Sequence, residues 1–189
     1  MLKLHTIVCS TRPGRVGLSV GRWFHAAAQG HGGFEAELVD LADFALPVYD
    51  EPHHPRLQRY EQAHTRAWAA SVAAADAYVF VTPEYNYGPP PSFVNALTYV
   101  YREWHHKAAG FVSYGGVSGG MRAVQAERLM LTSLKVMPMA EQVSIPMVGQ
   151  QIDGEGVFTP TEGQGKGAAA MLIELARWAG ALKPLRAEA

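Results

Sequence analysis

The apolar run from Ala77 to Val81, which ends abruptly at Thr82 and Pro83, is the feature that most constrains how this chain can fold. A short run without polar interruption is typical of a central parallel strand that is buried on both faces. A strand of that kind needs helices on both sides of its sheet. The run therefore predicts an α/β fold with a parallel sheet.

The rest of the chain alternates between apolar stretches of two kinds. Further strands are predicted over residues 4–8, 34–41, 108–114 and 140–145, and apolar side chains at helical spacing predict helices over residues 18–27, 57–72, 93–104, 121–135 and 171–179. Residues 45–55 and 146–167 are predicted loops, the second with a hairpin near Asp153 and Gly154. Five such units favour a flavodoxin-like three-layer sandwich, with a five-stranded parallel sheet of order 2-1-3-4-5.

Length and charge narrow the class of protein. A chain of 189 residues suits a single domain, which is predicted over residues 1–189. Only 17% of the residues are charged and the formal net charge is −1, so we expect neither a nucleic-acid partner nor a membrane partner. The single cysteine excludes an internal disulfide, and no apolar run approaches membrane-spanning length. These features predict a cytoplasmic protein.

A loop with the character of an anion site follows the first predicted strand. It covers residues 9–17, reads Cys-Ser-Thr-Arg-Pro-Gly-Arg-Val-Gly, and leads into the first predicted helix. Backbone N–H groups at a helix start, together with the helix dipole, favour a negative ligand. Ser10 and Thr11 add hydroxyl donors, and Arg12 and Arg15 add planar cations that match phosphate oxygens.

A dinucleotide site is one alternative for this loop. Gly14, Gly17 and Gly21 do not fit the spacing G-x-G-x-x-G, and no Gly-Lys-Ser/Thr of a Walker A loop occurs. Asp40 stands at the end of the second predicted strand, where a ribose-binding acid would lie. An aspartate in that position more often caps the following turn, so the dinucleotide signal is weak.

A phosphatase is the sharper alternative. Cys9 and Arg15 are separated by five residues, which resembles the nucleophile loop of the small tyrosine phosphatases, and a thiolate near helix N–H groups could attack a phosphate ester. Against this, Val16 stands in place of a hydroxyl residue, Pro13 removes one N–H, and no Asp-Pro dipeptide occurs. We expect Cys9 instead to be a small residue packed at the end of a buried strand.

Several segments together resemble the NAD(P)H-dependent FMN reductase family. They are Ser-Thr-Arg-Pro-Gly-Arg at residues 10–15, Pro-Glu-Tyr-Asn at 83–86, Asn-Ala-Leu at 95–97, and Ser-Tyr-Gly with Ser-Gly-Gly-Met-Arg-Ala-Val within 113–124. The likeness implies an enzyme that takes a hydride from NADH or NADPH through FMN and reduces free flavin, a quinone or a similar small acceptor. A non-enzymatic FMN electron carrier remains the alternative from another class.

The resemblance also implies which residues bind the cofactor. The FMN phosphate would be held by Ser10, Arg12, Arg15, Val16 and Gly17, the isoalloxazine ring would be framed by Pro83, Glu84, Tyr85, Asn86 and Tyr87, and its pyrimidine edge would be approached by Tyr114, Gly115, Gly116 and Ser118. No side chain is expected to act as acid or base, because the flavin N5 accepts the hydride. The resemblance further implies a homodimer or homotetramer.

The sequence leaves the roles of Glu84 and Tyr87 open, and its histidine pairs must be weighed as metal ligands. Glu84 fits a general base or a structural hydrogen bond equally well, and Tyr87 could cover the open face of the flavin or simply pack. The adjacent pairs His53-His54 and His105-His106 point apart on a helix or strand, and no metal motif occurs, so we expect no metal site.

Overall fold

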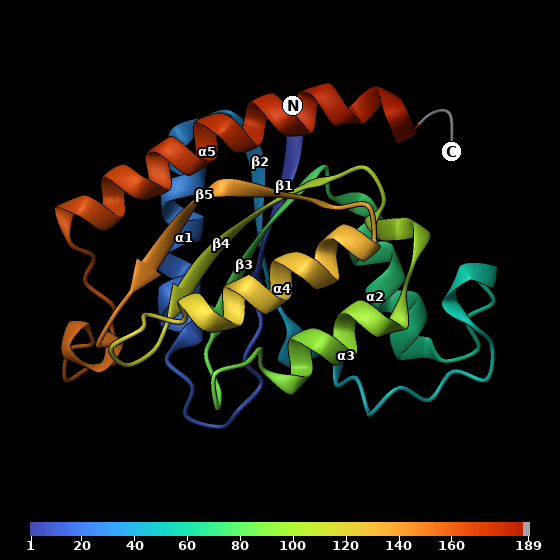
Figure 1. Ribbon diagram of the computed structural model, residues 1–189, viewed down its shortest axis with the longest axis horizontal. Helices are drawn as coiled ribbons and strands as arrows, with labels where there is room; N and C mark the ends of the chain where they lie inside the picture. Colours follow the sequence, from blue (N-terminus) through green and yellow to red (C-terminus); the bar gives the residue numbers. More distant parts are fainter. Residues whose placement is uncertain (187–189) are drawn as a thin grey trace.

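Five parallel strands form the central sheet of the computed structural model, which describes residues 1–186 (Figure 1). The strands are β1 (Leu2–Val8), β2 (Phe34–Asp40), β3 (Ala77–Pro83), β4 (Ala108–Tyr114) and β5 (Met137–Ile145). Their order is β2-β1-β3-β4-β5, and every pairing is parallel. The predicted flavodoxin-like fold and its strand order are confirmed. Residues 187–189 of the predicted domain lie outside the described residues.

Within residues 1–186, five α-helices cover the two faces of this sheet (Figure 1). The helices α1 (Gly17–His31) and α5 (Glu162–Leu182) share one core layer with the sheet, built around Phe24, Met171 and Leu175. The helices α2 (Ala63–Ala74), α3 (Pro91–Tyr99) and α4 (Met121–Ser133) share the other, built around buried aromatic side chains such as Trp68 and Phe93. The result is the three-layer sandwich that the sequence predicts.

The strands β3 and β4 occupy the centre of the sheet, and all seven residues of each are buried. Helices lie on both faces of these strands, so side chains pointing either way are removed from water. The prediction from the run Ala77–Val81 is therefore confirmed. In contrast, the edge strands β2 and β5 contain exposed and partly exposed positions as well as buried ones.

The helix predicted from residue 57 begins only at Ala63. Residues 55–57 form a single 3₁₀ turn that ends at Gln58 in a left-handed conformation, which breaks the helical course. The start of α2 is fixed by a distant side chain, because the Glu51 carboxylate accepts hydrogen bonds from the N–H groups of Glu61 and Gln62, both at 2.9 Å.

The helix predicted over residues 93–104 also divides. The helix α3 ends at Tyr99, and the fully buried Trp104 belongs to a separate 3₁₀ turn, Arg102–Trp104. The aromatic side chains of both pieces pack in the same core, which explains why their spacing imitated one continuous helix. The predicted role of this stripe as core is confirmed for Phe93, Leu97 and Trp104.

Two boundaries near the carboxyl end of the chain differ from the prediction. The strand β5 begins at Met137, three residues early, and α5 begins at Glu162 inside the predicted loop. A capping box between Thr161 and Gln164 starts α5, and the helix runs through Gly180 to Leu182. The predicted hairpin is confirmed by an antiparallel bridge between Ile152 and Phe158.

Asp76, just before β3, joins the first strand to the last helical segment. Its carboxylate accepts a hydrogen bond from the backbone N–H of Lys3 at 2.9 Å and pairs with Lys183 and Arg186. Burial opposes ionisation of Asp76, but these partners outweigh it and hold its pKa below the usual value. Among residues 1–186, no helix has both the length and the apolar character required to cross a membrane.

Candidate functional site

Three loops leave the sheet at its carboxyl edge, where the parallel strands end. The register pairs Val8 with Val81 and Val81 with Val112, so the loops after β1, β3 and β4 start at nearly the same level. They meet at the lower left of Figure 1. We call them the arginine loop (residues 9–16), the tyrosine loop (residues 84–90) and the glycine loop (residues 115–120). In a doubly wound sheet, ligands bind at this edge.

The arginine loop presents unoccupied backbone donors. Its only internal backbone hydrogen bond runs from Arg15 N to Arg12 O at 3.2 Å, and Gly14 has the positive φ of 70° that this turn requires. Within residues 1–186, the N–H groups of Thr11, Arg12, Gly14 and Val16 donate to no protein acceptor. The first turn of α1 follows directly and adds its own free N–H groups.

The two arginines of this loop have different surroundings. Arg12 is exposed, and its guanidinium reaches only the carbonyl of Pro13, at 3.3 Å. Arg15 is half-buried and forms an ion pair with Asp40. Asp40 also accepts a hydrogen bond from Ala42 N at 3.0 Å, so its interpretation as the cap of the following turn is confirmed. An anion at the loop would therefore meet Arg12 freely and Arg15 in competition with Asp40.

The tyrosine loop is a tight two-residue turn. Tyr85 and Gly88 exchange backbone hydrogen bonds of 3.0 and 2.9 Å, and Asn86 and Tyr87 between them both have positive φ values, 51° and 68°. The Tyr85 hydroxyl lies 2.7 Å from the buried Ser10 Oγ and links this loop to the arginine loop. The N–H groups of Asn86 and Tyr87 remain without a protein acceptor within the described chain.

Glu84 links the tyrosine loop to the start of α4. Its carboxylate, 6% exposed, accepts hydrogen bonds from Ser118 Oγ at 3.0 Å, Arg122 N at 3.1 Å and Arg122 Nε at 2.6 Å. Burial raises the pKa of Glu84, but the hydrogen bonds from Arg122 and Ser118 outweigh it, so the pKa lies below its usual value. A carboxylate held in this way is ionised and structural, and a general base role is not supported.

The same arginine covers the exposed tyrosine of the turn. The Arg122 guanidinium carbon lies 3.8 Å from the ring centroid of Tyr87, which is 72% exposed. Arg122 thus holds the tyrosine and glycine loops together, through Glu84 and through Tyr87. Sequence reasoning did not single it out, although it lies in the segment Ser-Gly-Gly-Met-Arg-Ala-Val that carries the family resemblance.

The glycine loop folds back tightly against β4. Gly119 and Gly120 both have positive φ, and a Cβ atom on Gly120 would lie 2.8 Å from the backbone N of Tyr114. The Gly119 carbonyl accepts hydrogen bonds from Ser113 Oγ at 2.7 Å and Ser144 Oγ at 3.1 Å. Only glycine permits this path, which leaves the N–H of Gly116 directed away from any acceptor in residues 1–186.

Tyr114 reaches the site both with its backbone and with the hydroxyl end of its buried ring. Its side chain is buried in the layer of α1, and the hydroxyl lies so close to Gly17 that a Cβ there would stand 2.3 Å from it. Its carbonyl accepts a hydrogen bond from Glu84 N at 3.3 Å. The structure therefore brings the predicted residues of all three loops to one edge, with the buried Tyr114 ring reaching from the glycine loop to Gly17.

Cys9 is a core residue. Its side chain is fully buried and donates a hydrogen bond to the Ile7 carbonyl at 3.5 Å. Burial, and then the nearby carboxylates of Glu127 and Asp40, raise the pKa of the thiol well above its usual value. An inaccessible, protonated thiol is not a nucleophile, so the packing interpretation of Cys9 is confirmed and the phosphatase alternative fails.

Glu127 is a buried acid beneath the site that the sequence did not reveal. It lies on α4, is fully buried, and accepts a hydrogen bond of 2.5 Å from Thr82 Oγ1. Burial raises its pKa to about 8, in part against the bond from Thr82. No sequence signal could have found it, because a glutamate within an amphipathic helix is ordinarily solvated.

The donors at this edge fit FMN. A phosphate monoester is a dianion, and the arginine loop offers it free N–H groups, the Ser10 hydroxyl, a helix N-terminus and the Arg12 guanidinium. A flat ring with polar edges needs donors at its rim and close backbone approach, which Asn86, Tyr87 and Gly116 provide. The residues present are therefore compatible with the cofactor that the resemblance implies.

Comparison with known proteins gives the same result. Among solved structures, a flavoenzyme NAD(P)H:(acceptor) oxidoreductase from Paracoccus denitrificans superposes with a TM-score of 0.75 at 20% identity, covering 95% of this chain and 98% of that one, which supports the fold. A Streptococcus pneumonia flavodoxin matches with a TM-score of 0.56 at 13% identity, covering 92% of this chain and 98% of that chain.

Sequence relatives define the family. The chain is 37% identical over 147 residues to an NAD(P)H-dependent FMN reductase of Schizosaccharomyces pombe, covering 76% of this chain and 74% of the relative. The family model for NADPH-dependent FMN reductase matches residues 2–150, which include all three loops. The chain therefore belongs to the NADPH-dependent FMN reductase family.

Proposed function

We propose that the three loops form the FMN site of this protein and that the reduced cofactor passes its electrons to free flavin or to a quinone. Membership of the family makes the chain an FMN-dependent oxidoreductase that uses NAD(P)H. The observation that supports the site most strongly is the set of free N–H groups in the arginine loop, directly before the start of α1.

The phosphate is proposed to lie in the arginine loop, held by Ser10, Arg12, Arg15, Val16 and Gly17. The amides of Val16 and of the first turn of α1 supply fixed dipoles, which need no reorganisation on binding. Arg12 supplies a charge without a competing carboxylate within residues 1–186. Arg15 contributes to the phosphate while Asp40 holds it in place.

The isoalloxazine ring is proposed to lie across the tyrosine and glycine loops, in contact with Pro83, Glu84, Tyr85, Asn86 and Tyr87 and with the backbone of Tyr114, Gly115, Gly116 and Ser118. When bound, FMN supplies the N5 atom that accepts the hydride. The chain contributes orientation, because Arg122 fixes both loops through Glu84 and Tyr87. Glu84 is proposed to stay ionised and to bind Arg122, and not to act as a base.

The choice of a flat acceptor rests on a groove between the arginine loop and the start of α3. A groove of about 880 Å³ runs from the arginine loop to α3, and its walls are largely apolar, with Val48, Pro89, Pro91 and Val94 among the residues that line it. A flat, weakly polar ring such as a quinone or a second flavin suits such a surface better than a charged acceptor does.

A homodimer or homotetramer is proposed as the working assembly. Exposed apolar side chains at Val94, Val117, Met121 and Met147 lie on or beside the elements of the site, and burial of such surface between copies is favourable. Sedimentation at several concentrations measures the assembly. We also propose a cytoplasmic location, supported by the single, unpaired cysteine.

Spectroscopy of the purified protein tests the proposal. Protein reconstituted with FMN should show the visible bands of bound flavin, and NADPH or NADH should bleach them in the absence of oxygen. Addition of a quinone or of free flavin should restore the bands within the turnover time. Failure to bind FMN would overturn the site, and bleaching without reoxidation by either acceptor would overturn the proposed acceptor.

The arginine loop can be tested separately. Replacement Arg15→Ala should weaken FMN binding by roughly 1.5 to 3 kcal/mol, because a hydrogen bond to a charged phosphate is lost and Asp40 is left unpaired beside it. Equilibrium titration of FMN against the apoprotein measures the change. The matched control is Arg22→Ala, an exposed arginine of α1, which should leave the affinity unchanged.

A further inference from the structure

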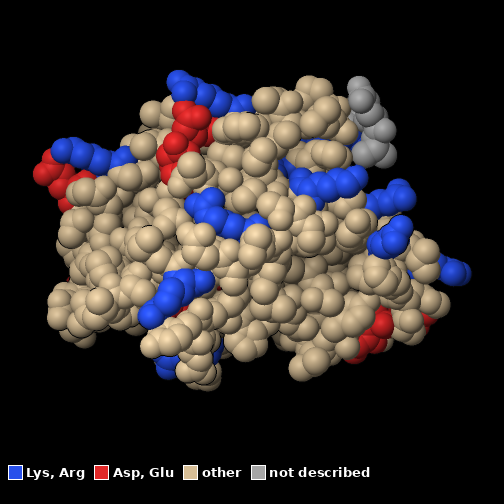
Figure 2. Space-filling view, in the orientation of Figure 1, with Lys and Arg blue, Asp and Glu red and all other residues tan. Residues whose placement is uncertain are grey.

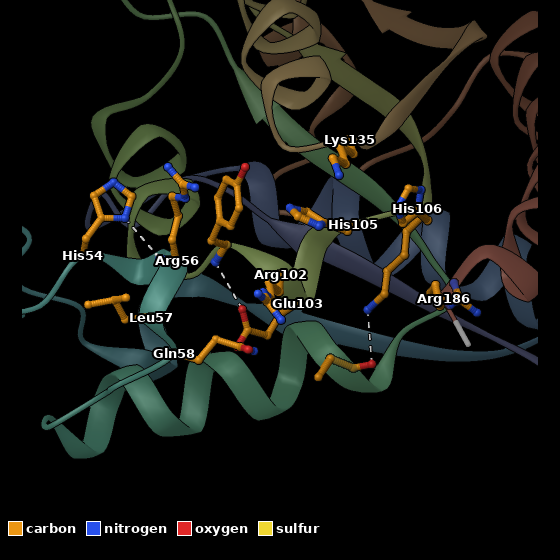
Figure 3. Close-up of a pocket in the computed structure, with 13 residues that line it drawn as sticks. His54, Arg56, Leu57, Gln58, Arg102, Glu103, His105, His106, Lys135 and Arg186 are labelled. Carbon is orange, nitrogen blue, oxygen red and sulfur yellow. Dashed lines mark hydrogen bonds between the residues drawn. The ribbon is translucent and has the colours of Figure 1, made fainter. Parts of the chain in front are cut away.

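A second cavity lies at the opposite, amino edge of the sheet, where β4 and β5 begin (Figure 3). Its volume is about 980 Å³. The residues that line it come from the segment before β4, Lys135 before β5, Ala73 at the end of α2, the stretch 54–58 around the 3₁₀ turn and the last described turn of the chain. None of them belongs to the arginine, tyrosine or glycine loops, so the cavity is separate from the proposed FMN site.

The lining of this cavity is strongly cationic. Five of the 16 lysines and arginines of the chain line it, namely Arg56, Arg102, Lys107, Lys135 and Arg186, beside three histidines and a single carboxylate, Glu103. Figure 2 shows several Lys and Arg side chains gathered at the right of this face of the molecule. Since the formal net charge of the chain is −1, this local excess is not a property of the whole surface.

The carboxylate of the cavity does not neutralise these cations. Glu103 accepts hydrogen bonds from Tyr60 Oη at 3.0 Å, Tyr101 N at 3.1 Å and Gln58 Nε2 at 3.2 Å, so its oxygens are engaged by neutral donors. Within residues 1–186, no carboxylate oxygen lies within 4.0 Å of a charged nitrogen of Arg56, Arg102 or Lys135. Three cations thus face one cavity without a counter-charge.

Lys107 places a further cation at the floor of the cavity. The residue is 3% exposed, and its Nζ donates hydrogen bonds to the carbonyls of Val72 at 2.6 Å and Ala73 at 3.1 Å. An ammonium group has three donors, so one remains for a ligand. Burial, and then the charge of Arg186, lower the pKa of Lys107 to about 7, and a bound anion would favour its charged form.

Backbone conformation holds two more of these side chains in place. His106 and Lys135 have left-handed φ values of 57° and 56°, and the N–H of His106 donates to the carbonyl of Lys135 at 3.0 Å. Neither is glycine, so each pays a conformational cost, and such strain gathers at ligand sites. In Figure 3, His54 and Arg56 stand on one side of the opening and Lys135, His106 and Arg186 on the other.

We infer that this cavity binds a phosphorylated small molecule of nucleotide size. Arginine and lysine side chains from several elements match the oxygens of two phosphate groups, and the planar side chains of His54, Tyr101 and His105 offer surfaces on which a ring can stack. The volume lies in the range of small-molecule sites. The cavity is partly open to solvent, and its cations converge from several elements on one place, which suits a compact dianion.

Calorimetric titration of ADP into the FMN-loaded protein tests this inference. We expect saturable binding of one ADP per chain, tighter than that of inorganic phosphate, with no change in the visible spectrum of the bound flavin. The double replacement Arg56→Gln and Lys135→Gln should weaken ADP binding by about tenfold or more, because two charge-assisted hydrogen bonds are lost. Neither side chain forms a hydrogen bond within residues 1–186, so the variant should fold.

A matched double replacement, Arg22→Gln and Lys166→Gln, removes the same charge elsewhere and should bind ADP as the unmodified protein does. Equal weakening in both variants, or no saturation at millimolar ADP, would overturn the inference. ADP that perturbs the flavin spectrum and is displaced by NADPH would assign its binding to the carboxyl edge. Tighter binding of an aspartate-rich peptide than of ADP would assign the cavity to an acidic protein segment. The affinity comparisons can be repeated on protein without FMN, and only the spectral result requires bound flavin.

Discussion

The two edges of this sheet are built for anions in opposite ways. At the carboxyl edge Arg15 pairs with Asp40 and Arg122 with Glu84, and apart from the free Arg12 the open donors are mainly backbone amides in tight loops. At the amino edge the unpaired side chains of Arg56, Arg102 and Lys135 surround a wide cavity, and the Arg186 that also lines it pairs with Asp76. The first arrangement selects a ligand by shape at close range, whereas the second attracts it by charge.

A buried titratable group lies under each edge of the sheet, and the two groups carry opposite charges when they are ionised. Glu127 lies beneath the carboxyl edge with its pKa raised to about 8, and Lys107 lies beneath the amino edge with its pKa lowered to about 7. In both cases burial is the largest cause, so each group is driven toward its neutral form. The comparison predicts that substitutions at the carboxyl edge affect ligand binding by changing the backbone shape. Substitutions at the amino edge should affect it by removing charge.

The largest effect is expected from Gly120→Ala at the carboxyl edge. A Cβ atom there meets the Tyr114 backbone at 2.8 and 2.9 Å, and φ of 83° is unfavourable for alanine. We expect the free energy of unfolding to fall by roughly 2 to 4 kcal/mol, measured by urea denaturation, with loss of FMN binding. Gly30→Ala on α1, where no atom lies within 4 Å, is the control and should not destabilise the protein.

The second effect concerns pH and Glu127→Gln. The pKa of this acid rises from 4.5 to about 8 on folding, so the unfolded chain releases its proton first and stability falls as pH rises through that window. Glutamine keeps the acceptor for Thr82 without a charge, so the variant should lose this dependence and be more stable at pH 8 by on the order of 2 kcal/mol. Parallel stability curves from pH 5 to 8 would contradict the assignment.

The third effect comes from removing Arg122, which holds the tyrosine and glycine loops together. Arg122→Ala removes the side-chain donors to Glu84 and the contact over Tyr87, so both loops lose their common anchor. We expect FMN binding to weaken by about fivefold, the equivalent of one hydrogen bond, with ADP binding at the amino edge unchanged. Because Glu84 ionises below its usual pKa, the difference should shrink as the pH falls below 4.5. A uniform loss at all pH values would contradict this explanation.

The smallest effect is expected from Lys135→Gly, which should raise the free energy of unfolding instead of lowering it. It tests the difference between the two edges most directly. Lys135→Gly relieves a left-handed conformation just after α4, a position where glycine is favoured. We expect the free energy of unfolding to rise by about 0.5 kcal/mol while ADP binding weakens, since the ammonium is lost. A variant that gains stability and keeps its ADP affinity would show that Lys135 is not a ligand.

The fold followed from the sequence because its signals are local. The buried run at Ala77–Val81, the prolines before α3 and the spacing of apolar residues each act over a few positions, and the order of the sheet follows from five β–α units. Errors arose where distant groups decide a boundary. Glu51 starts α2 from ten residues away, and two separate pieces of chain present Phe93 and Trp104 to one core.

The carboxyl edge could be anticipated for a similar reason, since its loops have characteristic residues at fixed spacing. What the sequence did not reveal were pairings across the chain, such as Arg122 with Glu84, and the burial of Glu127. The amino edge was missed altogether, because its cations are spread over 131 residues from Arg56 to Arg186 in sequence and gather only in three dimensions. From the sequence, the pair His105 and His106 was weighed only as a metal site and set aside.

Asp76 has a consequence for the order in which the molecule is completed during synthesis. Its carboxylate is secured by Lys3 at one end of the described chain and by Lys183 and Arg186 at the other. During synthesis, β1 therefore leaves the ribosome long before Lys183 and Arg186, the cations that pair with Asp76 next to β3, are added to the chain. Until the last helical turns are synthesised, the Asp76 carboxylate lies beside β1 and β3 without its counter-ions. This part of the amino edge of the sheet is therefore completed last.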